Sequence, residues 1–192
     1  MPPTRGCGII GSVISSIVAE FRRYKALGEA AIAQVSEADL TRAPEDSNSI
    51  AVIVWHIGGN LASRFTEFRT TDGEKPWRNR DDEFVARTVT RQELSTKWES
   101  GWEALLTALA SLTDDDLDQQ VTIRGQPHTI ADALLRALGH ITYHVGQIVY
   151  VAKSLRGAEW RTLSIPKGGS AGYNRNPRNE SAARHAATLE GR

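Results

Sequence analysis

The stretch TIADALLRALGHITYHVGQIVYVAKSLRG, residues 129–157, decides the fold of this chain. Its apolar residues are Leu134, Leu138, Ile141, Val145, Ile148, Ala152 and Leu155. They recur every three, four or seven positions, which is the spacing of one buried helix face. The opening T-I-A-D resembles a helix-capping pattern, and Gly157 stands where a helix commonly ends. We therefore expect a single long amphipathic helix here.

Three further segments share this helical period, over residues of about 9–35, about 49–70 and 90–112. The third begins with T-R-Q-E, a capping-box pattern. The strand signal is weak and short, at residues 121–125. Four long helices with almost no strand predict an all-α four-helix bundle. The link over residues 71–89 is long enough to cross the bundle, so helices two and three are expected to run parallel, in up-down-down-up order.

The composition changes after residue 158, where turn residues become frequent. We expect residues up to 173 to belong to one bundle domain. Residues 174–192 offer little apolar surface to bury, so they are expected to form a frayed, flexible tail.

Charge and cysteine content exclude several classes of function. There are 23 basic and 23 acidic side chains, and this balance argues against a nucleic-acid partner, which requires a basic face. No apolar run reaches the roughly 20 residues of a membrane span, so no membrane partner and a cytoplasmic location are expected. The one cysteine, Cys7, is expected to be an inert thiol at a helix start.

Three histidines predict a metal site. His140 and His144 are four residues apart within the long helical stretch, so they share a face one turn apart. His56 lies in SIAVIVWHIGGN, the other strongly apolar helical segment with a histidine. Buried imidazoles without partners are costly, and three of them on two helices leave a divalent metal with an open position. His128, before a helix cap, and His185, in the expected tail, are not assigned to this site.

At this point the sequence resembles a known family. The motif H-x-x-x-H-x-G-Q, formed by residues 140–147, and the upstream Trp55-His56-Ile57 resemble the DinB/YfiT-like superfamily. Residues 60–84 and 162–170 further resemble a bacterial branch of it with no assigned function. The resemblance covers about residues 9–173. It implies an up-down-down-up four-helix bundle that binds a divalent metal through His56, His140 and His144.

The resemblance also implies a chemistry. The superfamily includes transferases and isomerases that use bacillithiol, mycothiol or glutathione, and its members are often homodimers. Imidazole ligands suit zinc and nickel, and zinc is the default for three nitrogens with an open fourth position. A bound metal favours the thiolate form of a thiol, which then attacks a small electrophile. A thiol S-transferase with a small-molecule substrate is therefore the first hypothesis.

Several other side chains are expected near this site. Asn60 and Arg64 follow His56 on nearly the same helix face, where Asn60 either supports a metal-binding residue or forms a hydrogen bond to a bound ligand. Arg64 either binds a substrate carboxylate or forms an ion pair with Glu67 or with an acid of the link. Gln147, one turn after His144, either orients a ligand or packs between helices. The link is expected to fold over one end of the bundle as a lid, with anion contacts and an aromatic wall from Trp77, Arg78 and Arg80. The alternative is an ordinary solvated loop that one tryptophan anchors.

Two other functions remain open from the sequence. A metal-dependent hydrolase would use metal-activated water, although no carboxylate stands beside a metal histidine in sequence to act as its base. A base from the link would remove that objection. A non-catalytic helical binding protein would hold a structural metal. The catalytic residue and the substrate are not assigned.

Overall fold

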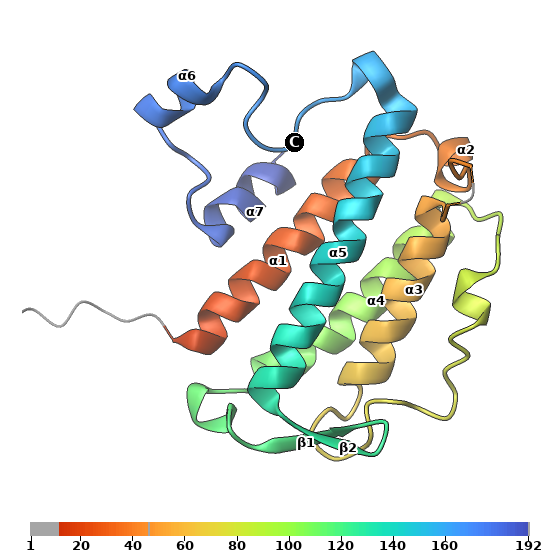
Figure 1. Ribbon diagram of the computed structural model, residues 1–192, viewed down its shortest axis with the longest axis vertical. Coiled ribbons are helices and arrows are strands. Elements are labelled where there is room, and N and C mark those ends of the chain that lie inside the picture. The colour runs from red at the N-terminus through yellow and green to blue at the C-terminus, as the bar shows by residue number, and fades with distance from the viewer. Residues whose placement is uncertain (1–11, 46, 192) are drawn as a thin grey trace, which may run out of the picture.

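The computed structural model describes residues 12–45 and 47–191, and these residues are mostly helical. Within these ranges, the longest helices lie side by side around one apolar core (Figure 1). Their bounds are α1 Val13–Ile32, α3 Ile50–Phe65, α4 Arg91–Ala110 and α5 Ile130–Arg156. The predicted predominance of helix is confirmed, while strand β1 (Gln120–Ile123) contributes Val121 and Ile123 to the core. Cys7 lies outside the described residues.

Each long helix begins at a hydroxyl side chain that accepts a backbone N–H of the first turn, at Ser12, Ser49, Thr90 and Thr129. The capping box predicted at Thr90 is present, because Glu93 also accepts the Thr90 backbone N–H at 2.8 Å. These caps satisfy donors that a helix start otherwise leaves unpaired. They explain why α4 and α5 begin where the sequence pattern indicates.

A glycine pair lets α3 and α4 approach closely. A Cβ added at Gly101 of α4 would lie 2.7 Å from the Cα of Gly58 on α3. No side chain fits at such a distance, so the two backbones are in direct contact at this crossing. Trp98 and Trp102 lie on the same helix and are among the largest fully buried side chains. The contact at Gly58 fixes the position of α3, the helix that carries His56.

The predicted extended piece is one strand of a small hairpin. Strand β1 (Gln120–Ile123) pairs antiparallel with β2 (Gln126–Thr129), with Ile123 opposite Gln126. The turn residues Arg124 and Gly125 both have positive φ, 55° and 69°, as a tight type I′ turn requires. β2 leads directly into α5, and the hairpin lies beside one end of the long helices (Figure 1).

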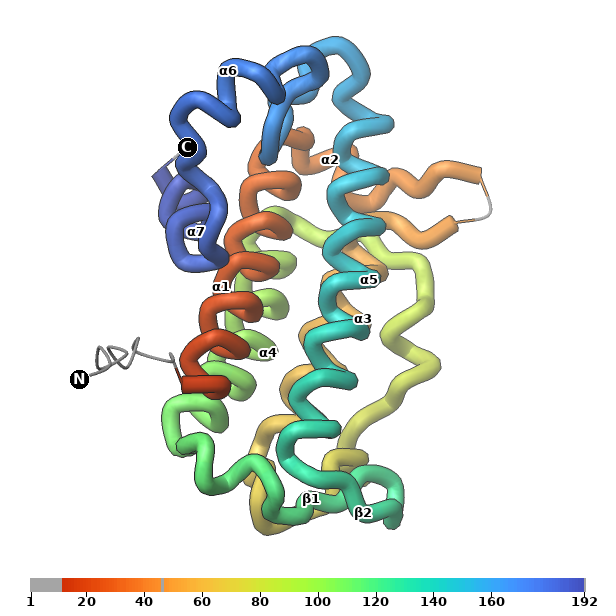
Figure 2. Tube along the Cα trace, turned by 60° about the vertical axis from the view of Figure 1, so that its left-hand side comes forward, coloured from red at the N-terminus to blue at the C-terminus, as the bar shows by residue number. Residues whose placement is uncertain are grey.

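The link between α3 and α4 runs back along the outside of the molecule (Figures 1 and 2). Helix α3 ends at Phe65, five residues before the predicted end, because Thr66 is extended and Glu67 adopts φ 49°. The one helical turn within the link is η1, Asp82–Phe84. The remaining short elements are α2 Glu37–Leu40, η2 Asp114–Asp116 and η3 Gly157–Glu159.

The C-terminal segment contains two short helices. The sequence predicts a frayed tail over residues 174–192, whereas the structure has α7 (Ala182–Glu190) within that range and α6 (Ser170–Arg175) overlapping its start. Helix α7 packs on α1 and buries His185, Ala186 and Leu189 (Figure 2). His185 also bonds through Nε2 to the carbonyl oxygen of Leu163 at 2.9 Å. A short amphipathic helix with one buried face accounts for this docking.

Candidate metal centre

The three predicted histidines meet in the structure. His56 comes from α3, and His140 and His144 come from adjacent turns of α5. The Nε2 atom of His140 lies 3.0 Å from Nε2 of His56 and 3.1 Å from Nε2 of His144. Two nitrogens bound to one tetrahedral zinc are about 3.4 Å apart, given Zn–N distances of about 2.0–2.1 Å. Two of the three nitrogen pairs therefore have nearly the spacing that a single ion requires, and all three ligand atoms lie within 4.8 Å of one another.

The outer partners of two histidines fix where their lone pairs point. Nδ1 of His56 donates to Oε2 of Glu83 at 2.9 Å, and Nδ1 of His144 donates to Oε1 of Gln147 at 2.7 Å. A neutral imidazole carries one proton, so Nε2 of both rings is an unprotonated acceptor. Both acceptors face Nε2 of His140, whose single proton satisfies at most one of them. Converging nitrogen lone pairs of this kind fit a divalent cation.

The electrostatic surroundings favour the neutral form of His140 and His144. Burial lowers the pKa of His140 to about 3, and electrostatic interactions with His144, His56 and the two cations Arg78 and Arg64 reinforce the shift. Burial also lowers the pKa of His144, although the hydrogen bond to Gln147 opposes the shift. A histidine must be neutral to bind a metal. The fold therefore presents these two rings in the protonation state that a ligand needs.

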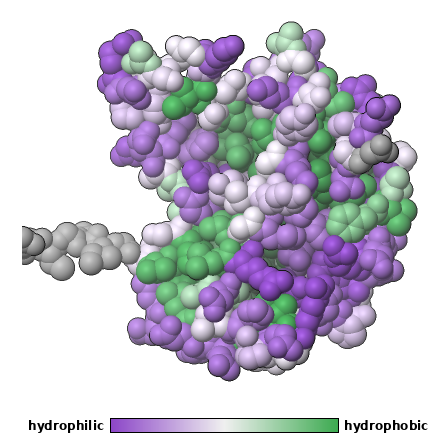
Figure 3. Space-filling view, viewed as in Figure 1, coloured by the Kyte–Doolittle hydropathy of each residue, from purple (hydrophilic) through white to green (hydrophobic). Residues whose placement is uncertain are grey.

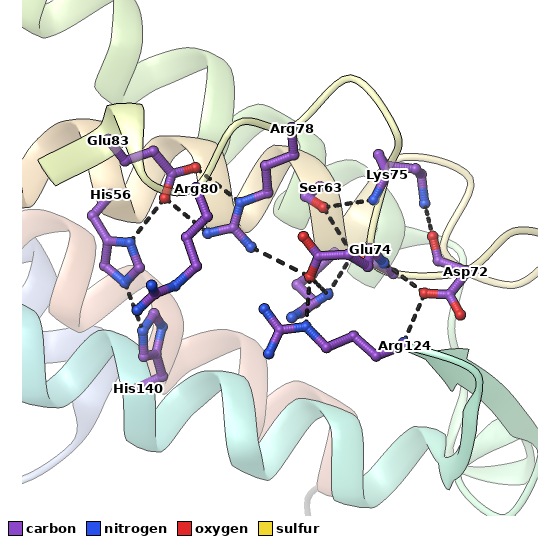
Figure 4. Close-up of polar contacts among 12 residues, drawn as sticks. His56, Ser63, Asp72, Glu74, Lys75, Arg78, Arg80, Glu83, Arg124 and His140 are labelled. Carbon is purple, nitrogen blue, oxygen red and sulfur yellow. Dashed lines mark hydrogen bonds and ion pairs between the residues drawn. The ribbon is translucent and has the colours of Figure 1, made fainter.

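Glu83 is a functional residue that the sequence analysis missed. It comes from η1 in the link, and both of its oxygens are bonded to Arg78, at 2.8 Å and 2.9 Å (Figure 4). Burial opposes ionisation of this carboxyl, but the hydrogen bonds from Arg78 and His56 outweigh burial and lower the pKa of Glu83. The result is a chain from Arg78 through Glu83 to His56. Such outer carboxylates orient metal-binding histidines and raise their basicity.

A glycine on α3 makes room for Glu83. A Cβ added at Gly59 would lie 2.1 Å from Oε1 of Glu83, so only glycine allows the carboxylate to lie against the helix. The two neighbouring glycines of the W-H-I-G-G sequence therefore have different roles. Gly58 admits α4, and Gly59 admits the carboxylate that supports His56.

A cavity of about 160 Å³ opens beside the cluster. Its described lining consists of His56, Asn60, Arg64, Phe65, Phe68, Arg78, Arg80, Ile123, Arg124, Ala133, Arg136, Ala137 and His140. Four of the residues predicted to contact substrate are therefore in its wall: Asn60, Arg64, Arg78 and Arg80. The structure does not bring Trp77 there, because this side chain is 59% exposed and outside the lining. Gln147 contacts His144 instead of the cavity.

The link is braced to the hairpin. Nη1 of Arg64 lies 3.2 Å from Oε2 of Glu74, and Nε of Arg124 donates to the same oxygen at 2.9 Å. Asp72 accepts the backbone N–H groups of Arg124 and Gly125 at 2.8 Å and 2.7 Å (Figure 4). Of the two alternatives for Arg64, the structure has the ion pair with an acid of the link. Arg64 nevertheless retains a place in the cavity wall.

These observations define a mostly helical protein with three clustered histidines, close enough to hold one metal ion, beside an arginine-lined cavity. Over residues 10–169 the chain matches the family model DUF1572, described as a protein of unknown function, and it belongs to that family. Searches of curated proteins and of solved structures gave no match. None of the described helices has the length and apolar character of a membrane span.

No helical spacing ties Glu83 or Arg124 to the histidines in the sequence. Arg136 was missed although a signal was present, because it precedes His140 by four residues within the same helical stretch. Glu83 stands 27 residues after His56 in a run of charged side chains. Its one distinguishing sign is its place in the stretch that resembles a known branch of the superfamily. Arg124 comes from a hairpin turn, and only the pairing of β1 with β2 brings it to the cavity.

Proposed function

We propose that this protein is a divalent-metal-dependent enzyme of the DinB/YfiT-like type, and that it transfers a small electrophile to the sulfur of a low-molecular-weight thiol. The observation that carries the proposal is the convergence of the three Nε2 atoms, with two tautomers fixed by Glu83 and Gln147. The path of the link along the outside of α3 also fits the up-down-down-up order of that superfamily (Figure 1).

The histidines and the cavity residues would have separate roles. His56, His140 and His144 would hold the ion, with zinc or nickel as the candidates. A metal held there would favour the thiolate form of a thiol at neutral pH. A thiolate would form a bond to an electrophilic carbon, the leaving group would depart with the electron pair of its broken bond, and the thiol proton would pass to solvent. Asn60 and the more exposed arginines of the cavity wall, Arg80, Arg124 and Arg136, would orient the reactants.

The state of Glu83 favours transfer over hydrolysis. A hydrolase needs a base that can reach the attacking water. The link does bring a carboxylate, but Glu83 lies behind His56 and is bonded to both His56 and Arg78. Among the described residues of the cavity wall there is no carboxylate. A thiol whose proton is already lost needs no such base.

The position of the cluster favours an enzyme over a structural metal site. Structural zinc sites are closed by four protein ligands. In the described part of the chain, the group that is close enough to share an ion has three members, and two of them line the cavity. An ion held there would retain a position accessible to a small molecule.

Metal content and thiol binding test the proposal. We expect about one zinc or nickel per chain in the tag-free protein, measured by mass spectrometry, and its loss in the His56/His140/His144 triple alanine variant. His128→Ala is the matched control, because His128 lies in β2 outside the cluster. After exchange for cobalt, adding glutathione or bacillithiol should produce a sulfur-to-cobalt charge-transfer absorption. A parent protein that takes up no metal, or a cobalt protein whose spectrum no thiol changes, would refute the proposal.

A further inference from the structure

The wall of the cavity beside the histidines has an excess of positive charge. Five arginines line it, and no carboxylate does so among the described residues. Two of the arginines are structural: the side chains of Arg64 and Arg78 are 12% and 2% exposed, and Glu74 and Glu83 hold them in place. The other three, Arg80, Arg124 and Arg136, are more exposed. Excess positive charge in a small cavity attracts anions.

Arg80 and Arg124 approach the cavity with unused donors. The Arg80 side chain is 51% exposed, its nearest carboxylate is Asp81 at 3.8 Å, and its guanidinium lies over the Phe84 ring. Figure 4 shows it extending toward His56 and His140. The Arg124 side chain is 54% exposed, and Nε is the guanidinium atom that donates to Glu74. Neither Nη of Arg124 has a protein acceptor among the described residues.

Arg136 completes the group from the opposite side. It precedes His140 by four residues and His144 by eight, so it shares their face of α5, one turn before the first metal ligand. It is exposed and forms no ion pair with any described residue. In Figure 3, strongly hydrophilic side chains gather where the lower part of α5 meets α3 and the hairpin.

The lining also has an apolar part, which consists of Phe65, Phe68, Ile123, Ala133 and Ala137. A ligand that matches both the arginines and these apolar side chains has an anionic group joined to a short carbon skeleton. The volume of about 160 Å³ limits that ligand to a small molecule or to one end of a larger one.

We propose that Arg80, Arg124 and Arg136 form an anion subsite that binds a carboxylate of the ligand whose reactive group lies at the histidine cluster. This inference rests on the proposed function and adds the substrate class to it: a small carboxylate-bearing thiol or electrophile. Arginine is suited to this task because its planar fork binds a carboxylate through two parallel hydrogen bonds.

Succinate, which has carboxylates and no thiol, is the probe for the subsite itself. Its binding is measured by isothermal titration calorimetry at low ionic strength, with the His56/His140/His144 triple alanine variant as host, so that direct binding to a metal does not contribute. We expect Arg124→Gln and Arg136→Gln each to weaken succinate binding by about tenfold or more, as the loss of a charge-assisted hydrogen bond predicts. The matched control is Arg22→Gln, an exposed arginine of α1 outside the cavity.

A second comparison identifies which reactant carries the carboxylate. In cobalt-loaded parent protein, mercaptosuccinate is compared with 1-thioglycerol, a neutral thiol. Tighter binding of mercaptosuccinate, with the advantage lost in Arg136→Gln, places the carboxylate on the thiol. Equal affinity of the two thiols, together with arginine-dependent succinate binding, supports the subsite and places the carboxylate on the electrophile.

The outcomes separate this inference from the proposed function. Arginine-dependent succinate binding in a protein that takes up no metal would retain the subsite and refute the metal enzyme. The inference is overturned if succinate does not bind, if both arginine variants bind it as the unsubstituted host does, or if Arg22→Gln weakens it equally. Circular dichroism of each variant excludes unfolding as the cause.

Discussion

Replacing Gly59 with alanine should weaken metal binding, although alanine has a higher helix propensity than glycine in α3. Real Cβ atoms essentially never come within 3.0 Å of another atom of this kind, and the new Cβ would lie 2.1 Å from Oε1 of Glu83. The carboxylate must therefore retreat by about 1 Å, which is enough to break its 2.9 Å bond to His56. Loss of such an outer partner typically lowers metal affinity by about 10- to 100-fold, or about 1.4–2.8 kcal/mol.

The effect on stability makes this a sharp test. Alanine in place of glycine inside a helix stabilises it by about 0.5–1 kcal/mol. Gly139→Ala in α5 is the matched control, because nothing lies within 4 Å of its added Cβ. It should gain stability and retain the parent Kd for zinc. Glu83→Gln should lose zinc affinity as Gly59→Ala does, since both variants remove the anion from His56.

The assay is competition for zinc between each variant and a chromophoric chelator, with circular dichroism to verify the fold. A Kd for Gly59→Ala within about twofold of the parent, measured in folded protein, would refute the reasoning that Glu83 supports the metal site through His56. A similar loss in Gly139→Ala would also refute it, because that change leaves Glu83 untouched.

Three further predictions concern the outer contacts of the site and the bundle. Gln147→Leu removes the acceptor of His144 Nδ1 and should weaken zinc binding about tenfold in the same competition assay; parent affinity would contradict the assigned tautomer. Gly101→Ala forces a Cβ against Gly58 and should lower the free energy of urea unfolding by about 1–3 kcal/mol; unchanged stability would contradict the close crossing. The Asp114 carboxylate accepts hydrogen bonds from the start of α1, which lower its pKa, so its stabilisation is complete above the ordinary value of 3.8 and is lost as pH falls through the folded pKa. The melting temperature of Asp114→Ala should therefore lie below that of the parent at pH 7, with the gap closing in stronger acid; a gap that is constant with pH would contradict this role.

Helix positions were the most predictable part of this protein, because period and caps are local. Thr90 and Thr129 mark the starts of α4 and α5 in the sequence and in the structure. The end of α3 was not predictable in the same way. Phe68 continues the apolar period and is buried, yet the helix stops at Phe65. The chain turns there because the hairpin and the link supply contacts that no local pattern encodes.

The difference between local patterns and tertiary contacts also applies to the candidate metal site. His140 and His144 were predictable because a spacing of four on one helix places them on one face. Their meeting with His56 followed from the apolar character of both helices. Glu83 was not predictable, since its position depends on the path of the link and on the space above Gly59. The seating of α7 on α1 likewise depends on surface that only the folded bundle presents.

The contacts of the link bear on how the site selects its ligand. The sequence predicts that the link folds over one end of the bundle as a lid. In the structure Asp72 caps the hairpin turn, Glu74 joins Arg64 to Arg124, and Glu83 joins Arg78 to His56. Protein contacts therefore hold the link at three points. Preorganised donors bind without a further ordering cost. We infer that selectivity comes from a rigid wall that presents metal ligands and arginines at set positions, so a ligand is recognised by the separation between its reactive group and its carboxylate.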